Sequence, residues 1–292
     1  MNYSPLRYPG GKTKMLPIIK SMIEKSNHSG TYVEPFAGGA GVALGLLFDG
    51  CVDSIVINDF DKSIYSIWRA ILTESEKLVQ LIKNTSISID EWHKQKSIYL
   101  NQNKKYSLEL GFAALYLNRT NRSGILKAGP IGGLNQNGKY LIDARFKKEE
   151  LIRRIEKIAS YRNKIKLYNC EINTFIKNII PKYENSVIYF DPPYFKKGKD
   201  LYKNFFTKKD HERLCKQIRS LSNDWIVSYD NEDYIKSLYS DYESKEYKIH
   251  HSAANNGTGI EVMFVSDNKL WLSDKELKTI KTSINFIGDT NE

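Results

Sequence analysis

The stretch Asp191-Pro192-Pro193-Tyr194 combines residue types that suit chemistry on a flat ligand. It follows an apolar run at residues 187–190, which is typical of a buried parallel strand that ends in a loop. The two prolines fix φ and carry no N–H, so the loop is stiff and its carbonyl oxygens can accept hydrogen bonds from outside the backbone. The Asp191 carboxylate adds an acceptor, and the Tyr194 ring adds a stacking face. Together these groups suit a planar ligand that carries an amino group.

A glycine-rich turn upstream has the composition of a nucleotide-type pocket. Residues 31–34 predict a short strand, residues 35–41 are rich in glycine, and an apolar helix follows. Glycine backbone at a helix N-terminus can approach a ligand closely. A dinucleotide fingerprint would need a further glycine where Leu44 stands, so NAD binding has little support. A tight strand-to-helix turn without a ligand is the alternative.

The next predicted strand, residues 54–57, leads to Asp59. Asp59 follows Gly38 by about 20 residues, the separation at which a carboxylate after the second strand reaches the ribose hydroxyls of an adenosine ligand. A solvent-facing aspartate in a turn is the alternative. The turn and the carboxylate together predict an adenosine pocket.

Near the N-terminus, Gly10-Gly11-Lys12-Thr13 resembles the end of a phosphate-binding P-loop. That motif needs a glycine where Leu6 stands and a strand before it, so we reject an ATPase. A helical pattern follows over residues 15–23.

The remaining elements alternate around one long interruption. Residues 64–117 have mostly helical spacing, and a loop rich in Gly, Asn, Lys and Arg runs from residue 118 to about 145. Further helices are predicted at about 148–160, 208–221 and 233–238, and further strands at 165–168, 186–190, 225–229, 247–250 and 262–266. This order predicts an α/β fold, a doubly wound sheet split by a mainly helical insertion. We divide the chain into a catalytic domain (1–72 and 161–270), an insertion (73–160) and a C-terminal tail (271–292).

The long loop is a candidate nucleic-acid contact, because loops of this length in compact domains are usually functional or disordered. Asn and Arg side chains read base edges, and the backbone donors of Gly and Ser suit phosphates. A solvated, variable loop is the alternative. The candidate contact residues are Asn118, Arg119, Asn121, Arg122 and Lys127.

Composition gives broader bounds. The chain has 44 Lys and Arg against 34 Asp and Glu, a net charge of +10, which suits a polyanionic partner but is also common in lysine-rich proteomes. Its three cysteines are widely spaced, which favours a reducing compartment. We find no signal peptide and no apolar run of about 18 residues, and so expect a soluble cytoplasmic protein without membrane contact. His250 and His251 are adjacent and would point apart on a strand, so we expect no metal site.

Four features in this order resemble the Dam-like (D12) N6-adenine DNA methyltransferases, over most of residues 3–270. They are Arg7-Tyr8-Pro9-Gly10-Gly11-Lys12, Phe36-Ala37-Gly38-Gly39-Ala40-Gly41, the acidic Asp59, and Asp191-Pro192-Pro193-Tyr194. The resemblance implies a Rossmann-like S-adenosylmethionine-dependent methyltransferase sheet with an inserted target-recognition domain. It implies S-adenosylmethionine as cofactor, S-adenosylhomocysteine as product, no metal, and double-stranded DNA as partner.

The resemblance also implies roles for individual residues. Phe36, Gly38 and Gly39 would line the methionine part of the cofactor, and Asp59 would hold its ribose. Glu171 would lie near the adenine of the cofactor. The other residues expected to border the cofactor are Tyr8, Lys12 and Asp191.

The catalytic role would belong to the Asp-Pro-Pro-Tyr loop. Asp191 and the Pro192 carbonyl would accept the two hydrogens of the adenine N6 amino group, with Tyr194 stacked on the base. Both hydrogen bonds favour a lone pair on N6 that attacks the sulfonium methyl in line, without a covalent enzyme intermediate. The adenine must be flipped out of the duplex to reach these groups. Nearby lysines, Lys196 and Lys197 with Lys199 and Lys203, would contact phosphates.

The insertion departs from the best-known members at residues 122–130, so the GATC target is not transferred and the recognition sequence stays open. An RNA adenine methyltransferase and a catalytically silent DNA-binding protein of the same fold are the alternatives. The sequence does not say whether a restriction enzyme accompanies the protein, whether it belongs to a phage or a host, or what its oligomeric state is.

Overall fold

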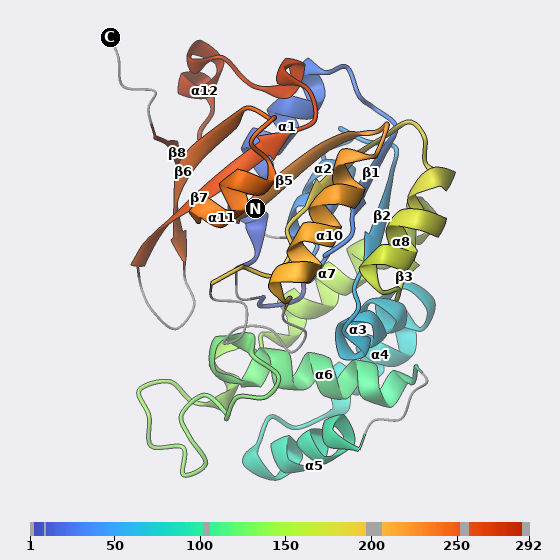
Figure 1. Ribbon diagram of the computed structural model, residues 1–292. Coiled ribbons are helices and arrows are strands. Elements are labelled where there is room, and N and C mark those ends of the chain that lie inside the picture. The colour runs from blue at the N-terminus through green and yellow to red at the C-terminus, as the bar shows by residue number, and fades with distance from the viewer. Residues whose placement is uncertain (1–2, 9, 102–105, 197–205, 252–256, 288–292) are drawn as a thin grey trace.

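An eight-stranded mixed sheet organises the computed structural model, which describes residues 3–8, 10–101, 106–196, 206–251 and 257–287 (Figure 1). The strand order is β3-β2-β1-β4-β5-β7-β6-β8. The first five run parallel, whereas β7 is antiparallel to β5 and β6, and β8 is antiparallel to β6. The strands are β1 (Thr31–Glu34), β2 (Ser54–Asn58), β3 (Ile165–Tyr168), β4 (Ser186–Phe190), β5 (Asp224–Asp230), β6 (Ser244–His251), β7 (Gly257–Val265) and β8 (Asn285–Phe286). The α/β prediction is therefore confirmed, as are the positions of the predicted strands.

Strand β4 shows why the central strands are apolar throughout, since all five of its residues are buried. Val187 and Tyr189 pack in one cluster with α1 (Leu16–Lys25) and α2 (Gly41–Phe48). Ile188 and Phe190 pack in a second cluster, with the helices on the other face of the sheet. Those helices are α8 (Ile172–Asn178), α10 (Lys208–Arg219) and α11 (Asp233–Leu238). A parallel strand covered on both faces needs no polar face, which gives a continuous apolar run.

A second layer of helices lies beyond the carboxyl ends of the parallel strands, below the sheet in Figure 1. It contains α3 (Lys62–Thr73), α4 (Ser75–Asn84), α5 (Ile89–Leu100), α6 (Leu108–Thr120) and α7 (Lys148–Ser160). Helix α3 packs on α6 and α7, α5 packs on α6, and α4 packs on α7. The predicted helical stretch is confirmed, while its separation as a domain at residues 73–160 stays a prediction.

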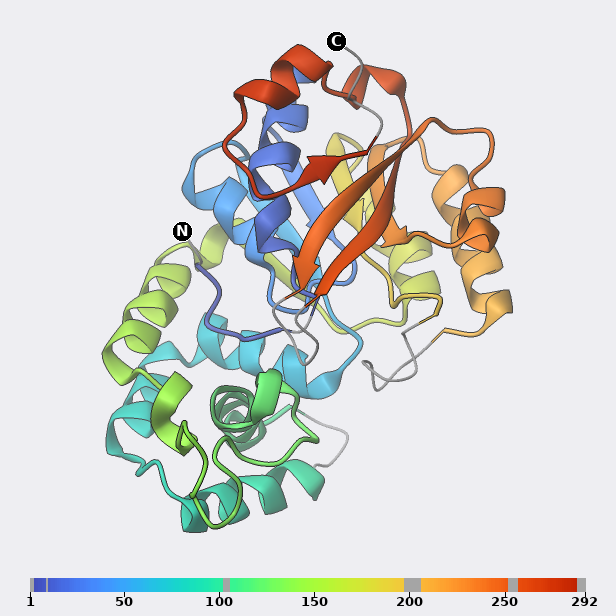
Figure 2. The ribbon, with the colours of Figure 1, turned by 90° about the vertical axis from the view of Figure 1, so that its left-hand side faces the viewer.

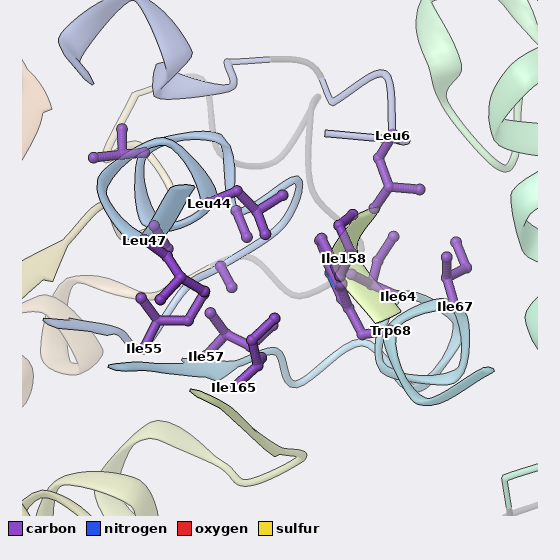
Figure 3. Packing of buried hydrophobic residues seen from close by; sticks show 14 of the residues in the cluster. Leu6, Leu44, Leu47, Ile55, Ile57, Ile64, Ile67, Trp68, Ile158 and Ile165 are labelled. Carbon is purple, nitrogen blue, oxygen red and sulfur yellow. The ribbon is translucent and has the colours of Figure 1, made fainter. Parts of the chain in front are cut away.

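The apolar core is continuous between the sheet and these helices. Ile55, Ile57 and Ile165 of the sheet lie near Ile64 and Trp68 of α3 in one buried cluster, which Figure 3 shows from close by. Helix α3 thereby joins the sheet to the helical layer.

The N-terminal segment runs across the helical layer before α1 begins (Figure 2). The Arg7 N–H donates a 2.8 Å hydrogen bond to Asn118 Oδ1, and Asn118 Nδ2 donates one of 2.8 Å back to the Arg7 carbonyl. Gly124 has φ +76°, and a Cβ there would lie 2.3 Å from the Arg7 carbonyl oxygen. These contacts hold Tyr8 and Lys12 between the two layers.

The C-terminal segment, which the sequence analysis sets apart as a tail, contains one further helix and one further strand. After α12 (Asp274–Thr279) the chain adds β8 beside β6, and Phe286 pairs with Tyr247. Ile284 is buried, and the rings of Phe286 and Tyr247 lie 5.7 Å apart. Two apolar residues, Ile284 and Phe286, hold this segment against the sheet. They are too few to form a periodic pattern in the sequence. No helix in the part of the chain that the structure describes is both long and apolar enough to cross a membrane.

Candidate active site

A pocket of about 880 Å³ opens at the carboxyl ends of β1, β2 and β4, where the N-terminal segment meets the sheet. Its volume is within the range of sites for small molecules and cofactors. The predicted residues that line it are Tyr8, Lys12, Phe36, Gly38, Gly39, Asp59, Arg119, Glu171 and Asp191. Residues predicted from separate motifs therefore meet at one site.

The glycine turn is held from three sides. Gly38 has φ +46°, and a Cβ on it would lie 2.8 Å from the Tyr8 ring, so a larger residue would both strain the backbone and displace the ring. Its N–H donates a 3.0 Å hydrogen bond to Asp59 Oδ2, and its carbonyl accepts one of 2.9 Å from Trp68 Nε1. The turn therefore presents a fixed backbone surface to the pocket.

Asp59 is mainly engaged with the protein. Its Oδ1 accepts a 2.8 Å hydrogen bond from the Asp61 N–H, while Oδ2 binds Gly38. The side chain is buried, and this burial, with the nearby Asp61, raises the pKa of Asp59 to about 7. Asp61, which also lines the pocket and begins α3 as its N-cap, was not singled out from the sequence.

Glu34 is a second pocket carboxylate that sequence reasoning missed. It ends β1, and its Oε1 accepts hydrogen bonds from the Ala43 N–H of α2 at 3.0 Å and from the Tyr32 hydroxyl at 3.2 Å. Burial raises the pKa of Glu34 to about 8. An acidic residue directly before the glycine turn was the available signal. Glu171 lies across the pocket, where it caps α8 by accepting a 2.9 Å hydrogen bond from the Asn173 N–H.

These groups fit an adenosine-type cofactor. The glycine backbone allows close approach, and several carboxylates can accept hydrogen bonds from ribose hydroxyls and amino groups. The carboxylates that line the pocket are Glu34, Asp59, Asp61, Glu171, Asp191 and Asp210.

Asp191 lines the same pocket and forms a buried ion pair with Lys12. Lys12 Nζ lies 2.8 Å from Asp191 Oδ1, and Ser228 Oγ donates a 3.1 Å hydrogen bond to that oxygen. Burial raises the pKa of Asp191, and Lys12 opposes the rise. Burial lowers the pKa of Lys12, but the carboxylates of Asp191 and Glu261 raise it more, so it lies well above its ordinary value. The Asp191 side chain is 20% exposed, which leaves it accessible from the pocket.

Tyr194 is buried and does not line the pocket. Its side chain is buried, its hydroxyl donates to Glu261 Oε1 and accepts a 3.0 Å hydrogen bond from Lys12 Nζ, and that ammonium lies 4.9 Å from the ring centroid. Pro193 lines the pocket, whereas Pro192 and Tyr194 do not. The ring that is expected to stack on the base is therefore buried in this structure, because its hydroxyl has buried partners that the sequence did not reveal. Its stacking on a base stays a prediction.

Two of the predicted DNA contacts are structural. Asn118 is 1% exposed and clamps Arg7, as described above. Asn121 is 0% exposed, accepts a 2.7 Å hydrogen bond from Trp92 Nε1, and donates to the carbonyl oxygens of Ile125 and Leu126. Direct contact of either amide with DNA is thus excluded in this conformation, since both hold the start of the long loop.

The cations of the site differ in exposure. Arg122 and Lys127 are exposed on the long loop. Arg119 lines the pocket, and burial lowers its pKa to about 10. Lys196 is exposed and lies 3.4 Å from Glu232 Oε1. Lys197, with Lys199 and Lys203, lies outside the described residues.

The loop after Asp191 is closed by a carboxylate of the neighbouring strand. Asp230, at the end of β5, accepts hydrogen bonds of 2.9 Å from the N–H groups of Phe195 and Lys196. These two hydrogen bonds fix the end of the loop that begins with Asp191 beside the pocket.

The chain is similar in sequence to two type II methyltransferases. The chain is 26% identical to the type II methyltransferase M.MjaIII of Methanocaldococcus jannaschii, over 82% of this chain and 89% of that protein. It is also 26% identical to the type II methyltransferase M1.LlaDCHI of Lactococcus lactis subsp. cremoris, over 87% and 88% of the two chains. A solved structure, the rRNA methyltransferase aviRa from Streptomyces viridochromogenes, matches with 11% identity over 83% of this chain and 79% of the other, and a TM-score of only 0.33.

Residues 8–256 match the family described as D12 class N6 adenine-specific DNA methyltransferase. This match spans the glycine turn, the helical layer and the Asp-Pro-Pro-Tyr loop. The chain therefore belongs to the D12 class N6 adenine-specific DNA methyltransferases, enzymes that methylate adenine in DNA with S-adenosylmethionine as the methyl donor.

Proposed function

We propose that this enzyme methylates an adenine that is flipped out of double-stranded DNA into the pocket beside Asp191. One observation carries the proposal: Asp191 and the glycine turn line the same pocket. A base inside a duplex cannot present its N6 atom to such a recessed carboxylate, so it must leave the stack, at a cost of a few kcal/mol.

The cofactor pocket is proposed to hold S-adenosylmethionine, with Phe36, Gly38 and Gly39 along its methionine part. Tyr8 and Lys12 border it, and Asp59 or its neighbour Asp61 faces the ribose. Glu171, at the start of α8, faces the adenine end. Bound there, the cofactor supplies an electrophilic methyl group on a sulfonium.

Asp191 and the Pro192 carbonyl are proposed to accept the two hydrogens of the adenine amino group. Both hydrogen bonds direct the N6 lone pair away from the loop and toward the methyl group. A new N–C bond would form as the C–S bond of the cofactor breaks, with S-adenosylhomocysteine as the leaving group. The methylated nitrogen would give one proton to the Asp191 carboxylate, which would pass it to water. No metal and no covalent bond to the enzyme take part.

Duplex DNA is proposed to contact the exposed cations of the long loop, Arg122 and Lys127, together with Lys196 near the Asp-Pro-Pro-Tyr loop. Lys197, which lies outside the described residues, is proposed as a contact from the sequence alone. Neutralised phosphates supply affinity, and side chains in a groove supply sequence choice. Because the relatives named above are type II methyltransferases, we infer that the chain modifies a defined DNA sequence.

Transfer of labelled methyl from S-adenosylmethionine tests the proposal. Label in N6-methyladenine of duplex DNA is expected. Transfer to RNA alone or to cytosine would exclude it. Sequencing with detection of modified bases, on DNA from cells that express the protein, would give the target sequence.

A further inference from the structure

A buried carboxylate, Glu261, lies behind Asp191 on a strand that carries no recognised motif. It is in β7, opposite Asp230 of β5 and Tyr247 of β6. Since β7 runs antiparallel to β5, the start of β7 lies at the sheet edge where β4 ends and Asp191 follows. Glu261 is 1% exposed and does not line the pocket.

Glu261 contacts Tyr194, at the end of the Asp-Pro-Pro-Tyr loop, and Lys12, which pairs with Asp191 at its start. Its Oε1 accepts the hydrogen bond from the Tyr194 hydroxyl, and its Oε2 lies 3.5 Å from Lys12 Nζ. Oε2 also accepts a 2.6 Å hydrogen bond from the Tyr247 hydroxyl, which fixes the carboxylate from the far side. The Lys12 ammonium therefore lies between two carboxylates, those of Asp191 and Glu261.

A buried charge of this kind is not explained by stability alone. Ion pairs buried in a protein often stabilise no more than apolar residues of the same size, because removing both charges from water is costly. The presence of Glu261 beside Lys12 instead changes how strongly Lys12 binds Asp191. With Asp191 as its sole counterion, the Lys12 ammonium would direct its positive charge at that carboxylate alone and would reduce the strength with which Asp191 accepts other hydrogen bonds. With Glu261 sharing the ammonium, Asp191 keeps acceptor capacity toward the pocket.

We propose that Glu261 is a positioning residue for methyl transfer. It holds the Lys12 ammonium and the Tyr194 hydroxyl so that the Asp191 carboxylate faces the pocket, ready to accept a hydrogen bond from the adenine amino group. The inference rests on the role proposed for Asp191.

The charges around Asp191 give this role a measurable signature. Burial raises the pKa of Asp191, Lys12 lowers it, and Glu261 raises it. Burial raises the pKa of Tyr32 and Glu34 of β1, of Tyr189 of β4 and of Tyr229 of β5, and the charge of Asp191 adds to each rise. Tyr194, of the same loop as Asp191, contacts Lys12. Loss of the Glu261 charge therefore lowers the pKa of Asp191, and the acidic limb of the rate against pH moves to lower pH.

The test is Glu261→Gln, which keeps the shape of the side chain and removes its charge. We expect the rate of a single turnover at saturating DNA and cofactor to fall about 10- to 100-fold, the effect of one hydrogen bond to a charged group. Affinity for S-adenosylmethionine stays within about threefold, and the acidic limb moves to lower pH. Glu246→Gln is the matched control, because that carboxylate is on neighbouring β6 and pairs with Lys236 at 3.1 Å, away from Asp191. It should leave rate and pH profile unchanged.

A turnover rate and pH profile equal to those of the unaltered enzyme would overturn the inference. The inference would also be overturned if the rate fell only in proportion to the amount of folded protein, measured by circular dichroism, while the acidic limb of the pH profile stayed in place. If Glu261→Gln does not fold, Tyr247→Phe replaces it, since that change removes one hydrogen bond to Oε2 and keeps the charge. A slower turnover with unchanged cofactor affinity then supports the inference, and an unchanged turnover contradicts it.

Asp191→Ala in the same series separates this inference from the proposed function. If Asp191→Ala remains active, the proposed site is wrong. If Asp191→Ala is inactive while Glu261→Gln behaves like the unaltered enzyme, only the role of Glu261 is wrong.

Discussion

The indole Nε1 of Trp68 donates a 2.9 Å hydrogen bond to the carbonyl oxygen of Gly38, so helix α3 directly holds the glycine turn that lines the pocket. Trp68 is fully buried, and its ring also belongs to the core shared by the sheet and the helical layer. The same side chain therefore contributes to packing and to the shape of the site.

Replacing Trp68 by Phe should weaken cofactor binding more than its effect on stability would suggest. The Gly38 carbonyl loses its donor, and an unsatisfied buried carbonyl costs about 1–3 kcal/mol. Calorimetric titration with S-adenosylmethionine, beside thermal unfolding, measures both effects. Trp225→Phe, on the opposite face of the sheet, is the control and should lower stability without changing cofactor affinity. Equal effects of the two changes on affinity would contradict the role of the Trp68 bond.

Asp191→Ala should abolish nearly all methyl transfer and leave affinity for S-adenosylmethionine within a few-fold. The reason is that its proposed contact in the reaction is with the base, while the proposed contacts of the cofactor are with the glycine turn. Transfer of labelled methyl and calorimetry measure the two properties on one preparation. A large loss of cofactor affinity would move Asp191 from the base to the cofactor.

Arg122→Ala should lower DNA affinity or alter sequence choice more than it lowers turnover on saturating DNA. An exposed arginine that neutralises one phosphate contributes about one unit to the slope of log affinity against log salt. Binding measured at several salt concentrations tests this. Lys269→Ala is the control, since Lys269 pairs with Asp224 at the start of β5, the sheet edge opposite the pocket. If affinity, specificity and salt slope all stay unchanged, the long loop is not a DNA contact.

Stability of the protein without ligand should fall as pH rises from about 5 to about 8.5. Burial raises the pKa of Glu34 to about 8 and that of Asp59 to about 7, whereas the unfolded chain has the ordinary values of 4.5 and 3.8. Over this window the folded state holds protons that the unfolded state has released, so the stabilisation is complete below the unfolded pKa values and is lost as pH rises through the folded ones. The loss is on the order of a few kcal/mol. Urea unfolding at both pH values measures it.

Glu34→Gln removes one of these titrations and should flatten the dependence, while Glu246→Gln, on partly exposed β6, should not. A stability that rises between pH 5 and pH 8.5 in the unaltered protein would show that these carboxyls are ionised in the folded state.

The sequence predicts the strands well because burial on both faces leaves a plain chemical pattern. The run at 186–190 and the segment 31–34 are strands with those bounds. The sequence also predicts that the glycine turn and Asp59 lie together, and both line one pocket. The glycine turn carries a local signature because its role depends on backbone shape. The strands and the glycine turn both rest on patterns within about ten residues.

The errors concern side-chain direction. Asn118 and Asn121 have the right chemistry for reading bases, but their amides turn inward to backbone and to Trp92. Residue type does not reveal which way an amide points. The burial of Tyr194 was not foreseen and Glu261 was missed for a related reason. Glu261, which accepts the hydrogen bond from Tyr194, is on β7, a strand that lies between β5 and β6 in the sheet. Such proximity depends on topology and leaves no local trace in the sequence.

The position of β7 between β5 and β6 also decides the order in which the contacts of Lys12 can form while the chain is synthesised. Asp191 and Tyr194 are made before Glu261, so Lys12 can meet them before β7 exists. Ribosomes add about 5–20 residues per second, so the carboxylate of Glu261 follows that of Asp191 by seconds. The arrangement in which Lys12 lies between two carboxylates can therefore form only after β7 has been made.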